Sequence, residues 1–477
     1  MPRAELTDFA GPSYTERSIG ISSDRTINMY PILLKPDVRK PTLALVGTPG
    51  LRRFCALPGG PIRMLHTCTN GRVFAVAGAT CYEIFAGGTA LPLGLVTPGT
   101  TRVSMADNGL AAMVVDGTAG WLFTFADNTY APITDPDFPG ADFVVYIDGY
   151  FAFNVPGTGR FGITGLFDPA AIDALDIATA EARPDPLLRV SSLHRELRLW
   201  GTLTVEAWFN SGNPDFPFQQ IQGTLLEQGL GAPDSLAILD NTYIWLSANS
   251  QGRGTVLTAT AYTSTPVSTP AQEQHWMSYP RLDDAVAFAY AHGGHDFYVL
   301  TFPSGNATWV LDLTTGFWHE RAYLGHTGAL ERHLAQWHCV GFGQHLVGDW
   351  RTGLLYHLDS QAYTDDGREI VRLRRFPHVR AQRERVVQHA LEVHVEQGEL
   401  VDDPVTPRHL MLRWSNDGGH TYSDEHWREL GPVGHYRQRA RWHKLGQARD
   451  RVYELRSTAA GPTRWLAAYL DATGGQH

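Results

Sequence analysis

A short unit of turn, apolar strand, turn and partner strand recurs through most of this chain of 477 residues. Copies of its first strand are GRVFAVAG at 71–78, GLAAMVVDG at 109–117, DGYFAFN at 148–154, RELRLWG at 195–201, NTYIWLS at 241–247, HDFYVLT at 295–301 and QHLVG at 344–348. A period of about 40 to 55 residues, filled by strands without a long helix, is typical of the blades of a β-propeller. We therefore predict an all-β fold whose residues 61–360 form a propeller of about six or seven blades.

The residues on either side of this repeated region have different patterns. Residues 1–60 contain short extended pieces that end at Pro or Gly, which predicts an N-terminal extended segment. Beyond the repeats, apolar and polar residues alternate cleanly at 386–395, as in a half-buried strand. We predict that residues 361–477 form a C-terminal β-domain, with enough strands for a β-sandwich.

Two stretches interrupt the repeats and are predicted to be loop insertions, at about 165–182 and 249–280. The first contains the one credible short helix of the chain, over 169–182. The second is rich in Ser, Thr, Gly and Pro and is expected to be a long strand and loop excursion. Surface loops of this kind commonly carry binding functions.

A turn motif with the spacing Ser-x-Asp-Gly-Gly-x-Thr-aromatic follows an alternating strand in the C-terminal region. Asp417 can accept hydrogen bonds from nearby backbone N–H groups, and Gly418 and Gly419 can adopt a positive φ at little steric cost. With Ser415 and Thr421 they predict the tight β-hairpin called an Asp-box. The motif occurs in glycan hydrolases and in non-enzymatic β-proteins alike, so it indicates a fold and not catalysis.

Composition narrows the classes of function. The net charge of −10 disfavours tight, general binding to a phosphate backbone. The sequence has no run of about 18 apolar residues and no signal-peptide pattern, so we expect no membrane interaction and no export. Cys55, Cys68, Cys81 and Cys339 lack metal-site or secreted-disulfide spacings and are predicted to be buried free thiols.

Histidine is abundant, at 20 residues, but its groups along the chain lack the spacing of metal ligands. His333, His338 and His345 lie near Cys339 without a matching second half. We interpret them as structural or surface histidines. No metal and no cofactor is therefore predicted.

Carboxylates at Asp135, Asp137, Asp283 and Asp284 could in principle form the acid pair of a glycosidase. A sialidase-like enzyme would also need several Asp-boxes and an inward-pointing arginine cluster, whereas this chain has one box. The sequence contains no GxSxG, HExxH, P-loop or GxGxxG motif. We predict that the protein is not an enzyme.

Two stretches are candidate interfaces with other subunits. One concentrates arginine in an otherwise acidic chain, at Arg368, Arg372, Arg374, Arg375, Arg380, Arg383 and Arg385. These arginines are interpreted either as a solvated strand face or as a subunit or phosphate contact. The other stretch is aromatic and comprises Trp208, Phe209, Phe216 and Phe218.

Several short stretches occur in a fixed order from one end of the chain to the other. They are INMYP at 27–31, GTPGL at 47–51, TRVSMA at 101–106, EAWFNSGNPDFPF at 206–218, WLS at 245–247, SNDGG at 415–419, RW at 441–442 and LGQAR at 445–449. In this order they resemble the packaged-DNA stabilisation proteins, or tail hub (nozzle) proteins, of short-tailed bacteriophages. The first two stretches and the long middle one carry most of the resemblance.

The resemblance implies a non-enzymatic virion protein, assembled in the host cytoplasm and built on a β-propeller. It implies a homo-oligomer, a hexameric ring below the portal and its head-to-tail adaptor protein. That ring would continue the channel for genomic double-stranded DNA, without sequence-specific binding. It would also retain packaged DNA and anchor tail fibres, tailspikes or a plug.

The main alternative is a receptor-binding or glycan-processing β-propeller. It predicts an aromatic-lined pocket with paired carboxylates and activity as a monomer, whereas a tail hub predicts stable rings and no turnover. A host surface-adhesion protein is a third possibility, which the absence of an export signal disfavours.

Overall fold

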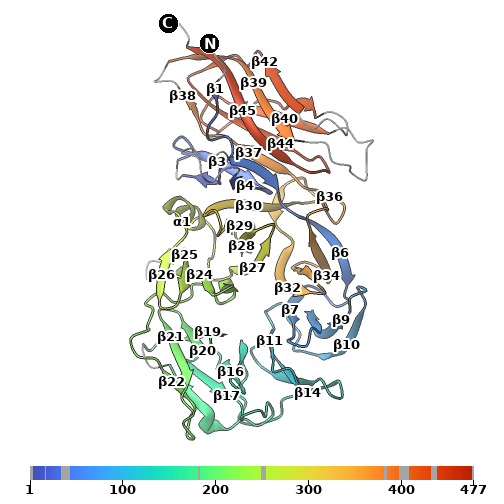
Figure 1. The fold of residues 1–477 in the computed structure, drawn as a ribbon, viewed down its shortest axis with the longest axis vertical. Helices are drawn as coiled ribbons and strands as arrows, with labels where there is room; N and C mark the ends of the chain where they lie inside the picture. Colours follow the sequence, from blue (N-terminus) through green and yellow to red (C-terminus); the bar gives the residue numbers. More distant parts are fainter. Residues whose placement is uncertain are drawn as a thin grey trace.

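The computed structural model describes residues 4–16, 18–33, 43–180, 183–248, 254–380, 384–396, 408–430 and 438–474. Strands account for 55% of the structure and helices for 3%, which confirms the all-β prediction. A ring of sheets forms one body, and a two-layered β-domain that holds both ends of the described chain lies at one edge of the ring (Figure 1).

Five free-standing, four-stranded antiparallel sheets form successive blades of the ring. They are β7 (Ile62–Thr67), β8 (Val73–Ala77), β9 (Thr80–Ile84) and β10 (Ala90–Leu95); β11 (Ser104–Asp107), β12 (Ala111–Val115), β13 (Gly120–Thr124) and β14 (Thr129–Pro132); β15 (Val144–Ile147), β16 (Tyr150–Asn154), β17 (Arg160–Ile163) and β18 (Ile177–Thr179); β19 (Leu187–Leu193), β20 (Glu196–Gly201), β21 (Val205–Asn210) and β22 (Phe218–Gln220); and β23 (Ala237–Leu239), β24 (Thr242–Ala248), β25 (Gly254–Thr260) and β26 (Thr263–Pro266). The prediction of a β-propeller is confirmed.

Two further blades belong to larger sheets. One consists of β27 (Val286–His292), β28 (His295–Phe302), β29 (Ala307–Asp312) and β30 (Phe317–Leu324), with β31 (Leu330–Arg332) paired to β30; the other consists of β32 (Ala335–Gly341), β33 (Gln344–Asp349), β34 (Leu354–Asp359) and β6 (Gly50–Ala56), extended by β35 (Thr364–Asp365) and β36 (Arg368–Glu369). In the second blade β6 runs antiparallel to β34, so the start of the chain closes the ring.

The sequence of a blade reflects how its strands are buried. The second strands of the first two blades, VFAVA in β8 and AAMVV in β12, are buried at every residue. They read as continuous apolar runs because neighbouring blades cover both faces of each sheet. The turns before these strands contain Gly71 and Gly109, both at positive φ, a conformation that costs glycine little.

The second body is a two-layered β-sandwich. One layer contains β4 (Met29–Leu33), β5 (Leu43–Gly47), β45 (Arg464–Gly474), β39 (Val386–Glu396) and β42 (Gln438–His443), with β1 (Ala4–Glu5) and β43 (Gln447–Ala448) at its margins; the other contains β3 (Ser23–Ile27), β37 (Arg372–Arg375), β44 (Asp450–Ser457), β40 (His409–Ser415) and β41 (His426–Glu429), with β2 (Tyr14–Thr15) and β38 (Val379–Arg380). Leu391, Trp442 and Trp465 of the first layer pack with Leu412 and Leu455 of the second. The predicted C-terminal sandwich is confirmed.

The sequence predicts a separate N-terminal segment over residues 1–60. The described residues of this stretch do not form one. Their strands are divided between the two bodies: β1, β3, β4 and β5 belong to the sandwich sheets, and β6 belongs to the propeller. The pattern is difficult to recognise because every partner of these strands lies more than about 250 residues away or in the same short stretch, and sequence periodicity reports only local order.

One continuous sheet joins the propeller to the sandwich. Strand β3 pairs in parallel with β30 of the propeller and antiparallel with β37 of the sandwich, so Ile27 lies opposite both Glu320 and Leu373. The next residue, Asn28, has a φ of 55° and ends the strand. Its side-chain amide donates to the carbonyl oxygens of Ala322 (2.8 Å) and Val371 (2.9 Å).

A partly buried ion pair reinforces this junction. Arg25 of β3 donates to Glu320 of β30 through two nitrogens, at 2.9 and 2.5 Å, and the Ser13 hydroxyl donates to the same carboxylate at 3.2 Å. Burial by itself raises the pKa of the Glu320 carboxyl, but the Arg25 guanidinium outweighs it and lowers that pKa below its ordinary value. The junction therefore contains a charged and paired group.

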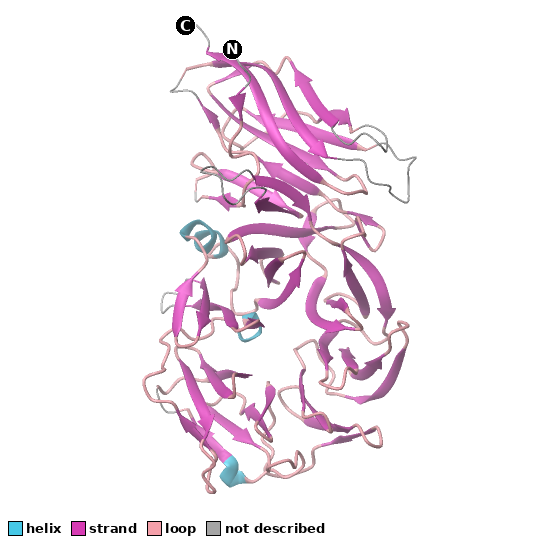
Figure 2. Cartoon of the chain, viewed as in Figure 1, coloured by secondary structure: helices cyan, strands magenta, loops and turns pink. Residues whose placement is uncertain are grey.

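The helices differ from those predicted. Over 169–182 the described residues form only a 3-10 turn, η1 (Ala174–Asp176), because Ile177 leaves it to become an outer blade strand paired with β17. The α-helix lies instead in the second insertion, at α1 (Pro270–Trp276), where Thr269 and Gln272 form a capping box (Figure 2). Among the residues that the structure describes, no helix is long and apolar enough to cross a membrane.

The second predicted insertion is also more regular than expected. Residues 254–266 form β25 and β26, the outer strands of a blade, and α1 follows them. The start of that insertion, at 249–253, lies outside the described residues. The Ser- and Thr-rich composition is therefore that of outer strands, whose exposed faces favour polar β-branched residues.

Replacing Asn28 with alanine tests the junction. The change removes the side-chain oxygen that accepts from the Ala322 N–H, at 2.9 Å. It also removes the side-chain N–H groups that donate to the carbonyl oxygens of Ala322 and Val371. Because unpaired buried polar groups cost about 1–3 kcal/mol each, we expect a loss of about 3 kcal/mol or more from the first unfolding transition in urea. Asn128→Ala is the control, because Asn128 has a similar φ of 57° in an exposed turn. Equal losses in the two variants would show that backbone conformation, and not the hydrogen bonds, is responsible.

Candidate functional site

The Asp-box turn follows β40 and is built around one carboxylate. Asp417 Oδ1 accepts hydrogen bonds from the Ser415 hydroxyl at 2.6 Å, the His420 N–H at 3.0 Å and the Thr421 N–H at 2.9 Å. Gly418 and Gly419 both adopt positive φ, at 76° and 103°. The side-chain hydrogen bond from Ser415, together with those from Thr421 and the backbone, holds the pKa of Asp417 well below its ordinary value.

Close to this turn, Arg413 and Arg375 both bind the buried carboxylate of Glu454. Arg413 donates to Glu454 Oε1 at 2.6 Å, and Arg375 donates to Glu454 Oε2 at 2.8 and 2.9 Å. The Tyr422 ring lies 4.6 Å from the Arg413 guanidinium carbon and 5.3 Å from that of Arg375. Arg375 therefore supports the Asp-box hairpin within this chain.

Arg372 and Arg374, from the predicted arginine interface, lie inside the molecule, each about 1% exposed. Arg374 donates to the carbonyl oxygens of Phe9 (2.7 Å), Asp8 (2.9 Å) and Pro12 (3.0 Å), while Arg372 donates to that of Ala459 (2.9 Å). Burial lowers the pKa of each guanidinium to about 10. Neither can form the solvated face or partner contact expected from the sequence, because both bind loops of their own chain.

The remaining arginines of this stretch are nearer to the surface. Arg380 is exposed and pairs with Asp450 at 2.9 Å, and Arg368 contacts His326. Arg385 is exposed, and Arg383 lies outside the described residues. The structure thus divides the arginine stretch into an internal group and a smaller group that another molecule could reach.

The four aromatic residues of the second candidate interface are also divided. Trp208 and Phe218 are buried, and Phe216 packs edge-on against Phe161 with ring centres 5.8 Å apart. The Trp208 ring contacts the same Phe161 at 5.2 Å. Only Phe209, which is 40% exposed, presents its ring to solvent among these four.

The centre of the propeller is a small cavity of about 250 Å³ lined by inner strands that include β7, β11, β23, β27 and β32. Arg102 crosses this space and donates to Asp234 at 2.9 Å. Its guanidinium carbon lies 4.8 Å from the Trp337 ring centre and 5.2 Å from that of Phe143. A charged pair between aromatic rings therefore occupies the middle of the ring.

A second arginine helps to fill the same centre. Arg189 donates to the carbonyl oxygens of Pro233 and Leu236, each at 3.0 Å, at the two ends of the 3-10 turn η2 (Pro233–Ser235). Burial, and then the neighbouring Arg102, lower the pKa of Arg189 to about 9. The turn, seen inside the ring in Figure 2, is thus held by a side chain of the neighbouring blade.

The carboxylates considered for a glycosidase stabilise turns instead. Asp135 accepts from the N–H of Asp137 at 3.0 Å, just after β14. Before β27, Asp283 pairs with Arg281 at 2.8 Å, and Asp284 accepts from the Ser304 N–H at 2.8 Å. The two groups of carboxylates lie on different blades, one after β14 and the other before β27.

The histidines grouped near residue 340 are packed into the fold. The ring nitrogens of His338 and His345 lie 3.0 Å apart, and His333 is buried. Burial lowers the pKa of His338 to about 3, so this imidazole is neutral at physiological pH. All four cysteines are free and buried, which confirms their predicted state.

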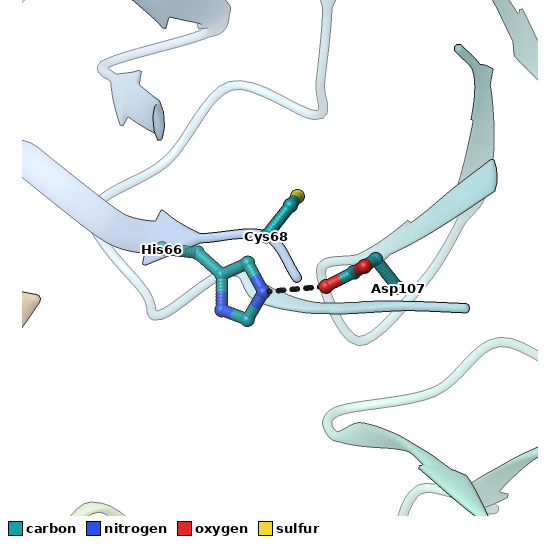
Figure 3. A group of neighbouring side chains, drawn as sticks. All are labelled: His66, Cys68 and Asp107. Atoms are coloured by element: carbon teal, nitrogen blue, oxygen red, sulfur yellow. Dashed lines mark ion pairs between the residues drawn. The ribbon is translucent and has the colours of Figure 1, made fainter. Parts of the chain in front are cut away.

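Sequence reasoning missed a different group, His66, Cys68 and Asp107 (Figure 3). Each offers one ligand atom of a kind that metals bind, and these atoms all lie within 4.8 Å of one another. His66 and Cys68 are close in sequence, but Asp107 ends the inner strand of the next blade. Their proximity could have been predicted only from the propeller topology, which places the inner strands of neighbouring blades side by side.

The described residues thus combine a propeller with a sandwich, and their charged groups fix loops and junctions. This combination defines an all-β protein of two domains, a propeller and a sandwich. The chain belongs to the bacteriophage P22 Gp10 family: the family's β-propeller matches residues 10–363 and its β-sandwich matches residues 372–473. It is therefore a structural phage tail protein.

Among curated proteins, a sequence search finds no match. Solved structures match this chain at low similarity. The surface component PorZ of Porphyromonas gingivalis has 11% identity and a TM-score of 0.38, and the alignment covers 66% of this chain but only 38% of PorZ. The extracellular domain of BT4673 from B. thetaiotaomicron has 8% identity and a TM-score of 0.44, over 90% of this chain and 61% of that one. The WD40 propeller of Doa1 has 10% identity and a TM-score of 0.41, over 65% and 96%.

The depressed pKa of Asp417 predicts how the hairpin responds to acid. A carboxyl whose pKa is lower in the folded than in the unfolded protein stabilises the folded state at pH values above its unfolded pKa of about 3.9. This contribution is lost as the pH falls below that value. We expect hydrogen exchange at Thr421 to accelerate, relative to its intrinsic rate, below about pH 4. Asp417→Asn should lose protection at every pH, while Asp215→Asn, in an exposed turn, should change nothing there. Unaltered protection in Asp417→Asn would contradict the role of this carboxylate.

Arg374→Lys tests whether the buried guanidinium fixes the N-terminal loop. A lysine cannot reproduce the planar fork that reaches the carbonyl oxygens of Asp8, Phe9 and Pro12. Because several buried acceptors would lose a charged donor, we expect a destabilisation of about 3 kcal/mol in urea and faster hydrogen exchange over residues 4–16. Arg385→Lys, at an exposed position, is the control. Exchange over 4–16 that stays as slow as in the control would refute the assignment.

Proposed function

We propose that the protein forms a hexameric ring below the portal and its adaptor, where it continues the channel for genomic DNA. The proposal rests on membership of the bacteriophage P22 Gp10 family, which spans both domains. In this proposal the protein acts in the virion, after assembly in the host cytoplasm, and it works without catalysis. It also retains packaged DNA and anchors tail fibres, tailspikes or a plug.

The filled centre of the propeller decides where DNA would pass. The cavity there has a volume of about 250 Å³, below the range of about 300–1,000 Å³ that holds even a drug-sized ligand. Arg102, Asp234 and Arg189 also cross it with fixed hydrogen bonds. We infer that a DNA duplex does not pass through one subunit, and we propose that the channel lies between subunits arranged in a ring.

The junction supports the same role. A ring that holds DNA under load needs subunits whose two domains keep a fixed orientation relative to each other. Strand β3 makes the propeller and the sandwich share one hydrogen-bonded sheet, and the pair of Arg25 with Glu320 reinforces it. The two domains then behave as one rigid body during assembly.

The charge of the chain fits a passage for DNA. With a net charge of −10, the protein offers little general attraction to phosphate groups. A wall that bound phosphates tightly would slow DNA as it leaves. We therefore propose that contact with DNA in the channel is weak and independent of sequence.

The oligomeric state tests the proposal directly. Light scattering and negative-stain images of the protein, alone and mixed with portal–adaptor complexes, should reveal rings with a central hole. Phe209→Asp should weaken assembly of the oligomeric ring by about tenfold or more if the exposed Phe209 side chain lies in the subunit contact. The reason is that burying a charge in that contact is costly. Leu110→Asp, at another exposed apolar residue, is the matched control. A monomer that ignores the adaptor would overturn the proposal, and normal rings from Phe209→Asp would remove this residue from the interface.

A further inference from the structure

His66, Cys68 and Asp107 meet at the ends of two neighbouring inner strands. His66 lies near the end of β7, Cys68 follows in the turn, and Asp107 is the last residue of β11. Cys68 and Asp107 are buried, while His66 lines the central cavity. The group is therefore enclosed by protein on one side and open to the cavity on the other.

The geometry gives Nε2 of the His66 imidazole one long contact, the ion pair with Asp107 that Figure 3 draws. His66 Nε2 lies 3.5 Å from Asp107 Oδ2, too far for a good hydrogen bond, and this buried nitrogen has no hydrogen-bond partner. A buried polar atom without a partner is uncommon in folded proteins and calls for an explanation. A cation between the two side chains would satisfy both of them.

The carboxylate is already oriented for such a role. Asp107 Oδ1 accepts from the Thr69 hydroxyl at 2.5 Å, and from the N–H groups of Thr69 and Gly109 at 3.1 Å each. Oδ2 shares only the Thr69 N–H, also at 3.1 Å, and is the oxygen nearest to His66. Hydrogen bonds that fix one oxygen of a ligating carboxylate are typical of the outer shell of metal sites.

The donor set identifies the kind of cation. One sulfur, one imidazole nitrogen and one carboxylate oxygen suit a borderline-soft divalent ion, whereas Ca²⁺ and Mg²⁺ prefer oxygen ligands alone. Three protein ligands leave a tetrahedral position for water on the cavity side. We propose that His66, Cys68 and Asp107 bind one zinc-class divalent cation, which links two adjacent blades at the propeller centre.

Binding would replace the thiol proton of Cys68, which leaves as the thiolate coordinates the ion. No oxidation or reduction takes place. The consequence for the fold is a bond between neighbouring blades. Blades otherwise contact one another mainly through side chains, since each forms its own hydrogen-bonded sheet.

Cobalt binding to the purified full chain tests the proposal. We expect the protein, stripped with a chelator and kept reduced, to bind Co²⁺ with a thiolate-to-cobalt absorption band that Zn²⁺ then displaces. Cys68→Ser should abolish the band, and His66→Gln should weaken binding by about tenfold or more. Cys55→Ser and His389→Gln, which change a buried cysteine and an exposed histidine elsewhere, should bind as the wild type does.

The unaltered protein gives a second test that needs no variant. X-ray absorption of its zinc-loaded form should reveal a mixed shell of sulfur with nitrogen or oxygen. A shell without sulfur would overturn the proposal, as would a cobalt band that persists in Cys68→Ser or the absence of retained metal after gel filtration. These outcomes are independent of whether the protein forms rings.

Discussion

The pairing of β3 with both β30 and β37 is the interaction on which the rest of the structure depends. It places a strand from the start of the chain between a propeller blade and a sandwich sheet. Asn28 ends that strand at a positive φ and uses its amide to bind the backbone on both sides. This side chain adds to the backbone pairing through which the two domains already meet.

Buried arginines carry out much of the remaining organisation. Arg374 fixes the N-terminal loop, Arg189 fixes η2 of the neighbouring blade, and Arg375 supports the hairpin of the Asp-box. Each guanidinium donates in a plane and in several directions, so one side chain can satisfy several carbonyl or carboxylate oxygens at once. Part of the arginine-rich composition is thus an internal feature of the fold, although many of the described arginines are exposed.

The sequence predicted what depends on local pattern. The apolar runs of β8 and β12 predicted the blades, and the spacing around Asp417 predicted a turn with the geometry now seen. It could not predict contacts between distant residues: the burial of Arg372 and Arg374, the pairing of β6 with β34, or the approach of Asp107 to His66. The predicted helix over 169–182 gave way to β18 because pairing with β17 outweighed a weak helical preference.

The closing of the ring by β6 has a consequence for the order in which the chain can fold. During synthesis β6 emerges early, but its partner β34 appears only about 300 residues later. Strand β3 likewise waits for β30 and β37. Until then both present unpaired edges, which bind other strands readily. A chain that ended before β34 and β37 would therefore leave both domains unfinished, because β6 and β3 would lack their partner strands.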